Sequence, residues 1–175
     1  MKLLLIIAGS LLALVAIVVI IGALLPKRHE ASVTVKFGKT PDEIWAVITD
    51  FAAAASWRSD VKSTEQLPDQ NGNAVWREET KQGPITYEII GSEPPKRLVM
   101  RIADDKLPFG GTWTYVIEAG VDRSRLTITE DGEVYNPIFR FMARFVFGHR
   151  ATLERYVKDL GQKLGEEVGF DPSAT

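Results

Sequence analysis

The sequence predicts an α+β domain, with an antiparallel sheet and a long C-terminal helix, preceded by one membrane-spanning helix. Three observations support this prediction. The chain begins with an apolar run, residues 32–135 alternate polar and apolar side chains over several short segments, and residues 138–164 repeat apolar side chains every three or four positions. Alternation is typical of strands that bury one face, and a spacing of three and four is typical of an amphipathic helix.

The apolar run extends from Leu3 to Leu25 without a charged side chain. As a helix it would be about 35 Å long, which is enough to cross a hydrocarbon core of about 30 Å. We therefore predict a retained transmembrane anchor over residues 1–26. Two alternatives are a cleaved signal peptide, whose apolar region is usually about 7–15 residues long, and a helix buried in the core of the domain.

The charges beside this run predict the orientation of the anchor. Only Lys2 precedes the run, whereas Lys27 and Arg28 follow it directly and Lys36 and Lys39 come soon after. Because positive charge is enriched on the cytoplasmic side of a span, this pattern favours a single-pass protein with a cytoplasmic C-terminal domain.

The overall composition excludes several classes of site. The chain has 21 Lys and Arg against 23 Asp and Glu, so its net charge of −2 argues against a nucleic-acid partner. It has no Cys, which excludes a disulfide framework and a Cys nucleophile. Its only histidines are His29 and His149, too few for a multi-histidine metal site. We expect no metal ion and no cofactor.

Residues 27–169 are predicted to form the folded domain, followed by a disordered tail over residues 170–175. A first strand over 32–37 leads to a helix start at Thr40–Glu43, with Thr at the N-cap and Pro at the first helical position. A second short helix follows over 51–55. Turn signals then separate six strands, which we expect over 61–67, 74–81, 85–90, 97–103, 112–118 and 125–135.

The last predicted element is one amphipathic helix over 138–164. Asn136 lies at its N-cap position and Pro137 at its first turn. Because consecutive hairpins give an antiparallel sheet, this helix must cover one face of the sheet.

This order of elements resembles the START-like superfamily, also called SRPBCC or Bet v 1-like, over residues 31–166. The resemblance rests on the helix start at 40–45, the turn and strand at 93–98, the strand at 111–115 and the long terminal helix. Within this superfamily, the sequence most resembles bacterial proteins described as polyketide cyclase/dehydrase and lipid transport proteins. The resemblance implies a helix-grip fold, in which a seven-stranded sheet curves around the C-terminal helix and leaves a pocket for a hydrophobic ligand.

The alternation of the strands predicts which side chains would line this pocket. They are large and mostly apolar, which suits a ligand cavity, although the same residues could also fill a solid core. The predicted lining residues are Trp76, Tyr87, Met100, Ile102, Trp113, Tyr115, Ile117, Ile128, Glu130, Met142 and Phe145.

Glu78 and Glu130 fall on the same predicted face and are weak candidates for catalysis. A carboxyl group on an apolar face would be desolvated and its pKa raised, which suits acid–base chemistry or the anchoring of a ligand. The alternative is that a bulge turns each side chain outward or that Arg77, Arg97 or Arg101 pairs with it.

The start of the terminal helix carries apolar side chains all round, with two arginines between them. Aromatic and basic side chains together are typical of a helix at a membrane surface. The alternative is that sheet edges and short helices cover the rings. The predicted membrane-interface residues are Phe139, Arg140, Phe141, Arg144 and Phe147.

Three functions follow from these observations. The first is a membrane-anchored binding protein for a lipid, isoprenoid or polyketide-like molecule, with Glu130 orienting a polar head. The second is a cyclase or hydrolase that uses Glu78 or Glu130. The third is a protein-interaction module with a filled core. The expected partners are the lipid bilayer and a hydrophobic small molecule, and the sequence names no protein partner.

Overall fold

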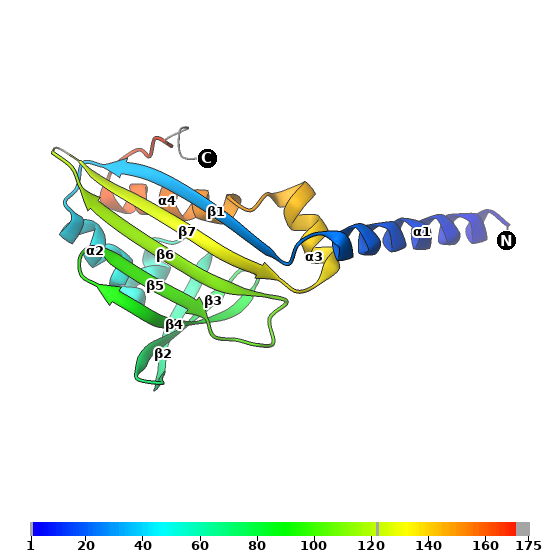
Figure 1. Cartoon of the computed structure of the whole chain (residues 1–175), viewed down its shortest axis with the longest axis horizontal. Helices are drawn as coiled ribbons and strands as arrows, with labels where there is room; N and C mark the ends of the chain where they lie inside the picture. The colour runs from blue at the N-terminus through cyan, green and yellow to red at the C-terminus, as the bar shows by residue number, and fades with distance from the viewer. Residues whose placement is uncertain (1, 122, 171–175) are drawn as a thin grey trace.

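The computed structural model describes residues 2–121 and 123–170, with the backbone alone at Phe147. A curved sheet grips a C-terminal helix on its concave face, and the N-terminal helix projects from one end of the domain (Figure 1). The predicted α+β helix-grip fold is therefore confirmed. At the C-terminus, Phe170 pairs with Val35 through an isolated β-bridge, and the remainder of the predicted tail lies outside the described residues.

All neighbouring strands of the sheet are antiparallel. The first strand pairs with the last, and the other strands are joined in order along the chain, so the sheet runs β1-β7-β6-β5-β4-β3-β2. The strands are β1 (Arg28–Phe37), β2 (Val61–Gln70), β3 (Asn73–Thr80), β4 (Gly83–Glu93), β5 (Arg97–Ile102), β6 (Phe109–Ala119) and β7 (Ser124–Val134).

Two short helices connect β1 to β2. Helix α2 (Pro41–Thr49) begins with a capping box, in which Glu43 N donates to Thr40 Oγ1 at 3.3 Å and Thr40 N donates to Glu43 Oε2 at 2.8 Å. The 3₁₀ helix η1 (Phe51–Ser56) follows at once. Reciprocal bonds of this kind satisfy backbone donors that a helix start otherwise leaves unpaired.

The C-terminal helix is not continuous, and the prediction of one unbroken helix over 138–164 is wrong. It is divided into α3 (Pro137–Met142), the π-helical segment η2 (Ala143–Phe147) and α4 (Ala151–Leu164). The break lies at Gly148, whose φ of +73° is open to glycine but strained for other residues. Helix α4 covers the sheet, while α3 turns towards the N-terminal helix (Figure 1).

The N-terminal helix α1 (Lys2–Leu24) is long and apolar enough to cross a membrane. Its most apolar stretch is not buried in the domain, so the alternative of a buried core helix is wrong. A helix of this kind at an N-terminus is a candidate anchor, and a signal sequence would have the same length and composition.

The last turn of α1 packs tightly on α3. A Cβ atom added at Gly22 would lie 1.9 Å from the carbonyl oxygen of Pro137, so only glycine allows this approach. The guanidinium of Arg140 donates to the carbonyl oxygens of Leu25 at 2.8 Å and Ala23 at 3.4 Å. These carbonyls lie at the C-terminal end of the helix, where the helix dipole is negative. The Arg140 guanidinium therefore caps α1.

We predict that Gly22→Val separates α3 from α1. The added side chain overlaps the Pro137 backbone, and overpacking of this size costs about 1–3 kcal/mol. Amide hydrogen exchange in α3 should therefore become faster than in the unmodified protein. Gly9→Val is the matched control, because a Cβ atom at Gly9 meets nothing within 4 Å. Equal exchange in the two variants would contradict the tight contact.

Candidate functional site

A cavity of about 530 Å³ lies between the concave face of the sheet, α3 and α4. Its volume is in the range of small-molecule sites, and its presence disfavours the alternative of a completely filled core. The residues that line it are His29, Arg58, Asp60, Thr80, Gln82, Ile85, Tyr87, Met100, Ile102, Phe109, Gly110, Trp113, Tyr115, Glu130, Glu133, Val134, Phe139, Met142, Ala143, Gly148, His149, Ala151, Thr152 and Arg155.

Aromatic and apolar side chains form the middle of the cavity wall. Tyr87, Met100 and Ile102 come from β4 and β5, and Trp113 and Tyr115 follow on β6, as the alternation of the strands predicts. These strands are neighbours in the sheet, so the five side chains form one continuous surface. Such a surface favours an apolar ligand.

Tyr156 of α4 packs against the same aromatic side chains on the concave side of the sheet. Its ring centroid lies 6.0 Å from that of Trp113 and 5.5 Å from that of Tyr115. Burial raises the pKa of Tyr156 to about 12, so its hydroxyl stays protonated at neutral pH. The tyrosine therefore adds a neutral polar group to an otherwise apolar support.

Four residues predicted to line the cavity lie elsewhere. Ile117 and Ile128 are on the predicted face, but α4 covers that part of the sheet and they belong to the filled core. Trp76 packs against Phe51 of η1, with ring centroids 5.6 Å apart. Phe145 is on the outer surface and 59% exposed, because η2 does not continue the course of α4. Met142 and Glu130 do line the cavity.

A buried ionic cluster forms one polar end of the cavity, beneath β2 and β3. Arg58 Nη1 donates to Glu78 Oε1 at 2.6 Å, and Arg58 Nη2 donates to Asp60 Oδ2 at 3.2 Å. The Arg58 guanidinium also lies 5.3 Å from the centroid of the Tyr156 ring. Arg58 and Asp60 line the cavity, and Glu78 lies behind Arg58.

This cluster places Glu78 differently from the sequence-based hypothesis. Glu78 is buried as expected, but its partner is Arg58 from the end of η1 and none of the arginines considered from the strands. Burial raises the pKa of Glu78, and the charge of Arg58 opposes this effect. Glu78 is thus best described as a positioning residue for Arg58. The only sequence signal for Arg58 was its place beside Trp57 at a helix end.

The other polar end of the cavity lies beneath β1 and β7. The rings of His29 and His149 are stacked, with centroids 3.9 Å apart and 26° between their planes. His29 Nε2 lies 3.7 Å from Glu130 Oε1. His29 faces Gly132 across the β1–β7 pair, where a Cβ atom would overlap the imidazole, so glycine makes room for the ring.

Sequence reasoning treated the two histidines as separate residues. They were counted as too few for a metal site, whereas both line the cavity and contact each other. Burial lowers the pKa of His149, His29 and Arg144 lower it further, and Glu130 opposes this. A pair of imidazoles with a nearby carboxylate could bind a polar group or move a proton.

The predicted membrane-interface residues lie on α3 and η2. Phe139 is 52% exposed and also lines the cavity, Arg144 is exposed, and Phe141 is half-buried with its ring 4.9 Å from that of Phe145. Arg140 differs from the expectation, since its guanidinium is buried and caps α1. The side chain of Phe147 lies outside the described residues.

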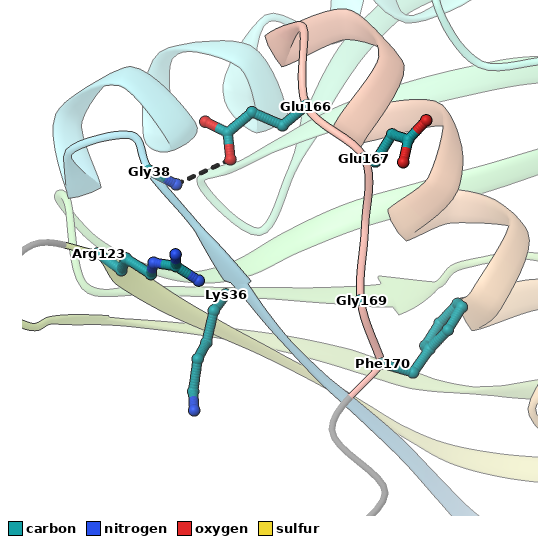
Figure 2. A pocket seen from close by; sticks show the side chains of 7 residues that line it. All are labelled: Lys36, Gly38, Arg123, Glu166, Glu167, Gly169 and Phe170. Carbon is teal, nitrogen blue, oxygen red and sulfur yellow. Dashed lines mark hydrogen bonds between the residues drawn. The ribbon is translucent and has the colours of Figure 1, made fainter.

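A second hollow, also about 530 Å³, lies where β1 ends and β7 begins (Figure 2). It is open to solvent and lined mainly by charged and glycine residues, with Glu166 Oε2 accepting a bond from Gly38 N at 2.8 Å. This bond ties the end of the C-terminal segment to the end of β1. We therefore assign this second hollow a structural role and consider the cavity between the sheet, α3 and α4 the candidate site.

A sheet that grips a helix and encloses a largely apolar cavity defines a class of single-domain proteins with an internal pocket. The sequence identifies the family within this class. Residues 28–168 match the model of the polyketide cyclase / dehydrase and lipid transport family, and the chain belongs to this family. No curated protein matches the chain at a significant level.

Solved structures share the fold at low sequence identity. A START superfamily protein from Mycobacterium smegmatis is 21% identical, with 78% of this chain and 97% of that chain covered and a TM-score of 0.62. The Zhui aromatase/cyclase from Streptomyces sp. R1128 is 16% identical, with coverage of 79% and 92% and a TM-score of 0.62. Norcoclaurine synthase from Thalictrum flavum is 9% identical, with coverage of 80% and 88% and a TM-score of 0.62.

We predict that the lowered pKa of His149 makes the fold less stable in acid. The folded state resists protonation of this imidazole, whereas the unfolded chain takes up the proton near pH 6.5. The free energy of unfolding should fall as pH drops from about 8 through this value. In His149→Asn the difference between pH 8 and pH 5.5 should shrink, as measured by denaturant unfolding in detergent. An unchanged difference would contradict the prediction.

Proposed function

We propose that this protein is a membrane-anchored binding protein for a hydrophobic small molecule, such as a lipid, isoprenoid or polyketide-like compound. The observation that carries this proposal is the cavity of about 530 Å³ with an aromatic and apolar wall. Polar groups are gathered at its two ends, an arrangement suited to a ligand with an apolar body and a polar head. Glu130 would orient that head.

The energetics of burial support an apolar ligand. Removing apolar surface from water contributes about 25 cal/mol per Å², so a ligand that buries about 300 Å² gains roughly 7 kcal/mol before the costs of ordering are subtracted. The aromatic wall belongs to a braced sheet, which reduces the ordering cost on the protein side. Binding of this kind requires no covalent chemistry.

The N-terminal helix supports a location at the membrane. An apolar ligand dissolves in the bilayer, and a tethered pocket meets it at a higher effective concentration than a freely diffusing one. The charges that follow α1 favour a cytoplasmic domain. The family description includes lipid transport, which supports an apolar ligand but does not bear on the location of the protein.

The first test is to fill the cavity. Ile102→Trp places a larger side chain in the wall, and overpacking of about 1–3 kcal/mol should weaken binding by about tenfold or more. Binding would be measured on the full chain by native mass spectrometry with lipid extraction, and by titration with fluorescent fatty-acid and quinone analogues. Ile90→Trp is the matched control, because Ile90 is exposed and outside the cavity lining. The proposal would be contradicted if the unmodified protein is purified without an apolar compound and also binds none of the fluorescent analogues.

A second candidate function is a cyclase-type enzyme. It is favoured by the carboxylate of Glu130 beside two imidazoles inside the cavity. A structural neighbour is an aromatase/cyclase, which shows a shared fold and no more. Under this function, Glu130 would act as a general acid or base on a bound substrate.

The variant Glu130→Gln separates the two functions. It keeps the shape of the side chain but removes its charge and its capacity for proton transfer. If the protein is an enzyme, turnover of a polyketide-like substrate should fall by about 100-fold or more. If it is a binding protein, ligand affinity should change only several-fold. Glu118→Gln, on the exposed side of β6, is the control for the charge change.

A further inference from the structure

We propose that one surface of α3 and η2 inserts into the lipid interface and that the cavity opens to the bilayer there. The ligand would then pass between bilayer and cavity without crossing water. We call this the portal surface, and it consists of Ile138, Phe139, Arg144, Phe145 and Val146. The proposal rests on the membrane anchoring and ligand binding proposed above, and it adds the route and the contact surface.

The first observation in support of the proposal is the position of α3 relative to α1. Arg140 binds the final carbonyls of α1, and Gly22 contacts the backbone of Pro137, so α3 is held beside the last turn of the apolar helix. Helix α1 is about 35 Å long at 1.5 Å per residue, against a hydrocarbon core of about 30 Å. If α1 spans the bilayer, α3 therefore lies at the boundary between hydrocarbon and headgroups.

The second observation is that the apolar side chains of the portal surface are exposed. Phe139, Phe145 and Val146 are 52%, 59% and 58% exposed, and Ile138 is also exposed. Grouped apolar exposure of this kind marks a surface that meets a partner. Because the segment is attached to the end of α1, the partner already adjacent is the bilayer. The exposed Arg144 within the segment suits lipid phosphates.

The third observation is that the segment with the portal surface also lines the cavity. Phe139, Met142 and Ala143 belong to this segment and also line the cavity. The same few turns therefore present one side to the exterior and another to the ligand space. At the end of this segment, Gly148 lines the cavity and His149 stacks on His29 of β1. An opening beneath α3 would thus face the interface of the membrane.

Insertion can be measured with a probe at a single cysteine, because the natural chain contains none. The full chain with Val146→Cys would be labelled with the fluorophore NBD and reconstituted into phosphatidylcholine vesicles that contain a lipid with a nitroxide near the headgroup. We expect several-fold stronger quenching than for the same label at Val121→Cys. Val121 is fully exposed on the β6–β7 connection at the far end of the domain.

The outcomes of this experiment are distinct. Equal quenching at the two positions would overturn the insertion. A Val146 label that is shielded from the lipid quencher but self-quenches as protein density rises would assign the surface to a second copy of the chain, which also overturns the proposal. Strong quenching at Val146 alone supports it.

The route is tested by the rate of ligand transfer. The double variant Phe145→Ser, Val146→Ser changes exposed residues outside the cavity lining. We expect transfer of a dansyl-labelled fatty acid from vesicles to slow by about fivefold or more, with unchanged affinity in detergent. An unchanged rate would overturn the portal and leave the binding function intact. If the unmodified protein binds no probe while the Val146 label is quenched, the proposed binding function fails and the membrane contact stands.

Discussion

The break at Gly148, where φ is +73°, separates the C-terminal part of the chain into two helices with different packing partners. Helix α4 follows it and fills the concave face of the sheet with Leu153, Val157 and Leu160. Helix α3 precedes it and packs on α1. Residues on both sides of the break line the cavity, Met142 and Ala143 before it and Ala151 and Thr152 after it. The lining of the pocket and the junction with α1 therefore both involve this break.

The character of the cavity also depends on where its charged and polar groups lie. At one end, Arg58 uses both terminal nitrogens on Glu78 and Asp60, so this buried charge is compensated within the protein. At the other end, two imidazoles stack beside Glu130. Between these ends the wall is aromatic and apolar, which suits the apolar body of the proposed ligand, with its polar head at one end.

Most of the fold could be predicted from the sequence, because alternation, turn signals and the capping box at Thr40 are local. The alternation along β4, β5 and β6 also predicted that the side chains of Tyr87, Met100 and Trp113 lie in the cavity wall. The break at Gly148 was missed because one glycine does not interrupt a three-and-four pattern.

Long-range contacts were missed for a different reason. The pairing of Arg58 with Glu78, the stacking of His29 on His149 and the cap formed by Arg140 each join segments far apart in sequence. No local pattern encodes these contacts, since they arise only when the sheet has curved and the helices have packed.

The cap at the end of α1 has a mechanical consequence. Arg140 also reaches the carbonyl oxygen of Tyr135 at 3.5 Å, so one guanidinium links α1, α3 and the end of β7. A helix longer than the local hydrocarbon thickness tilts in the bilayer. If α1 spans a bilayer as proposed, this cap would make the domain rotate with the tilt of α1, and bilayer thickness would set the angle at which the domain meets the membrane.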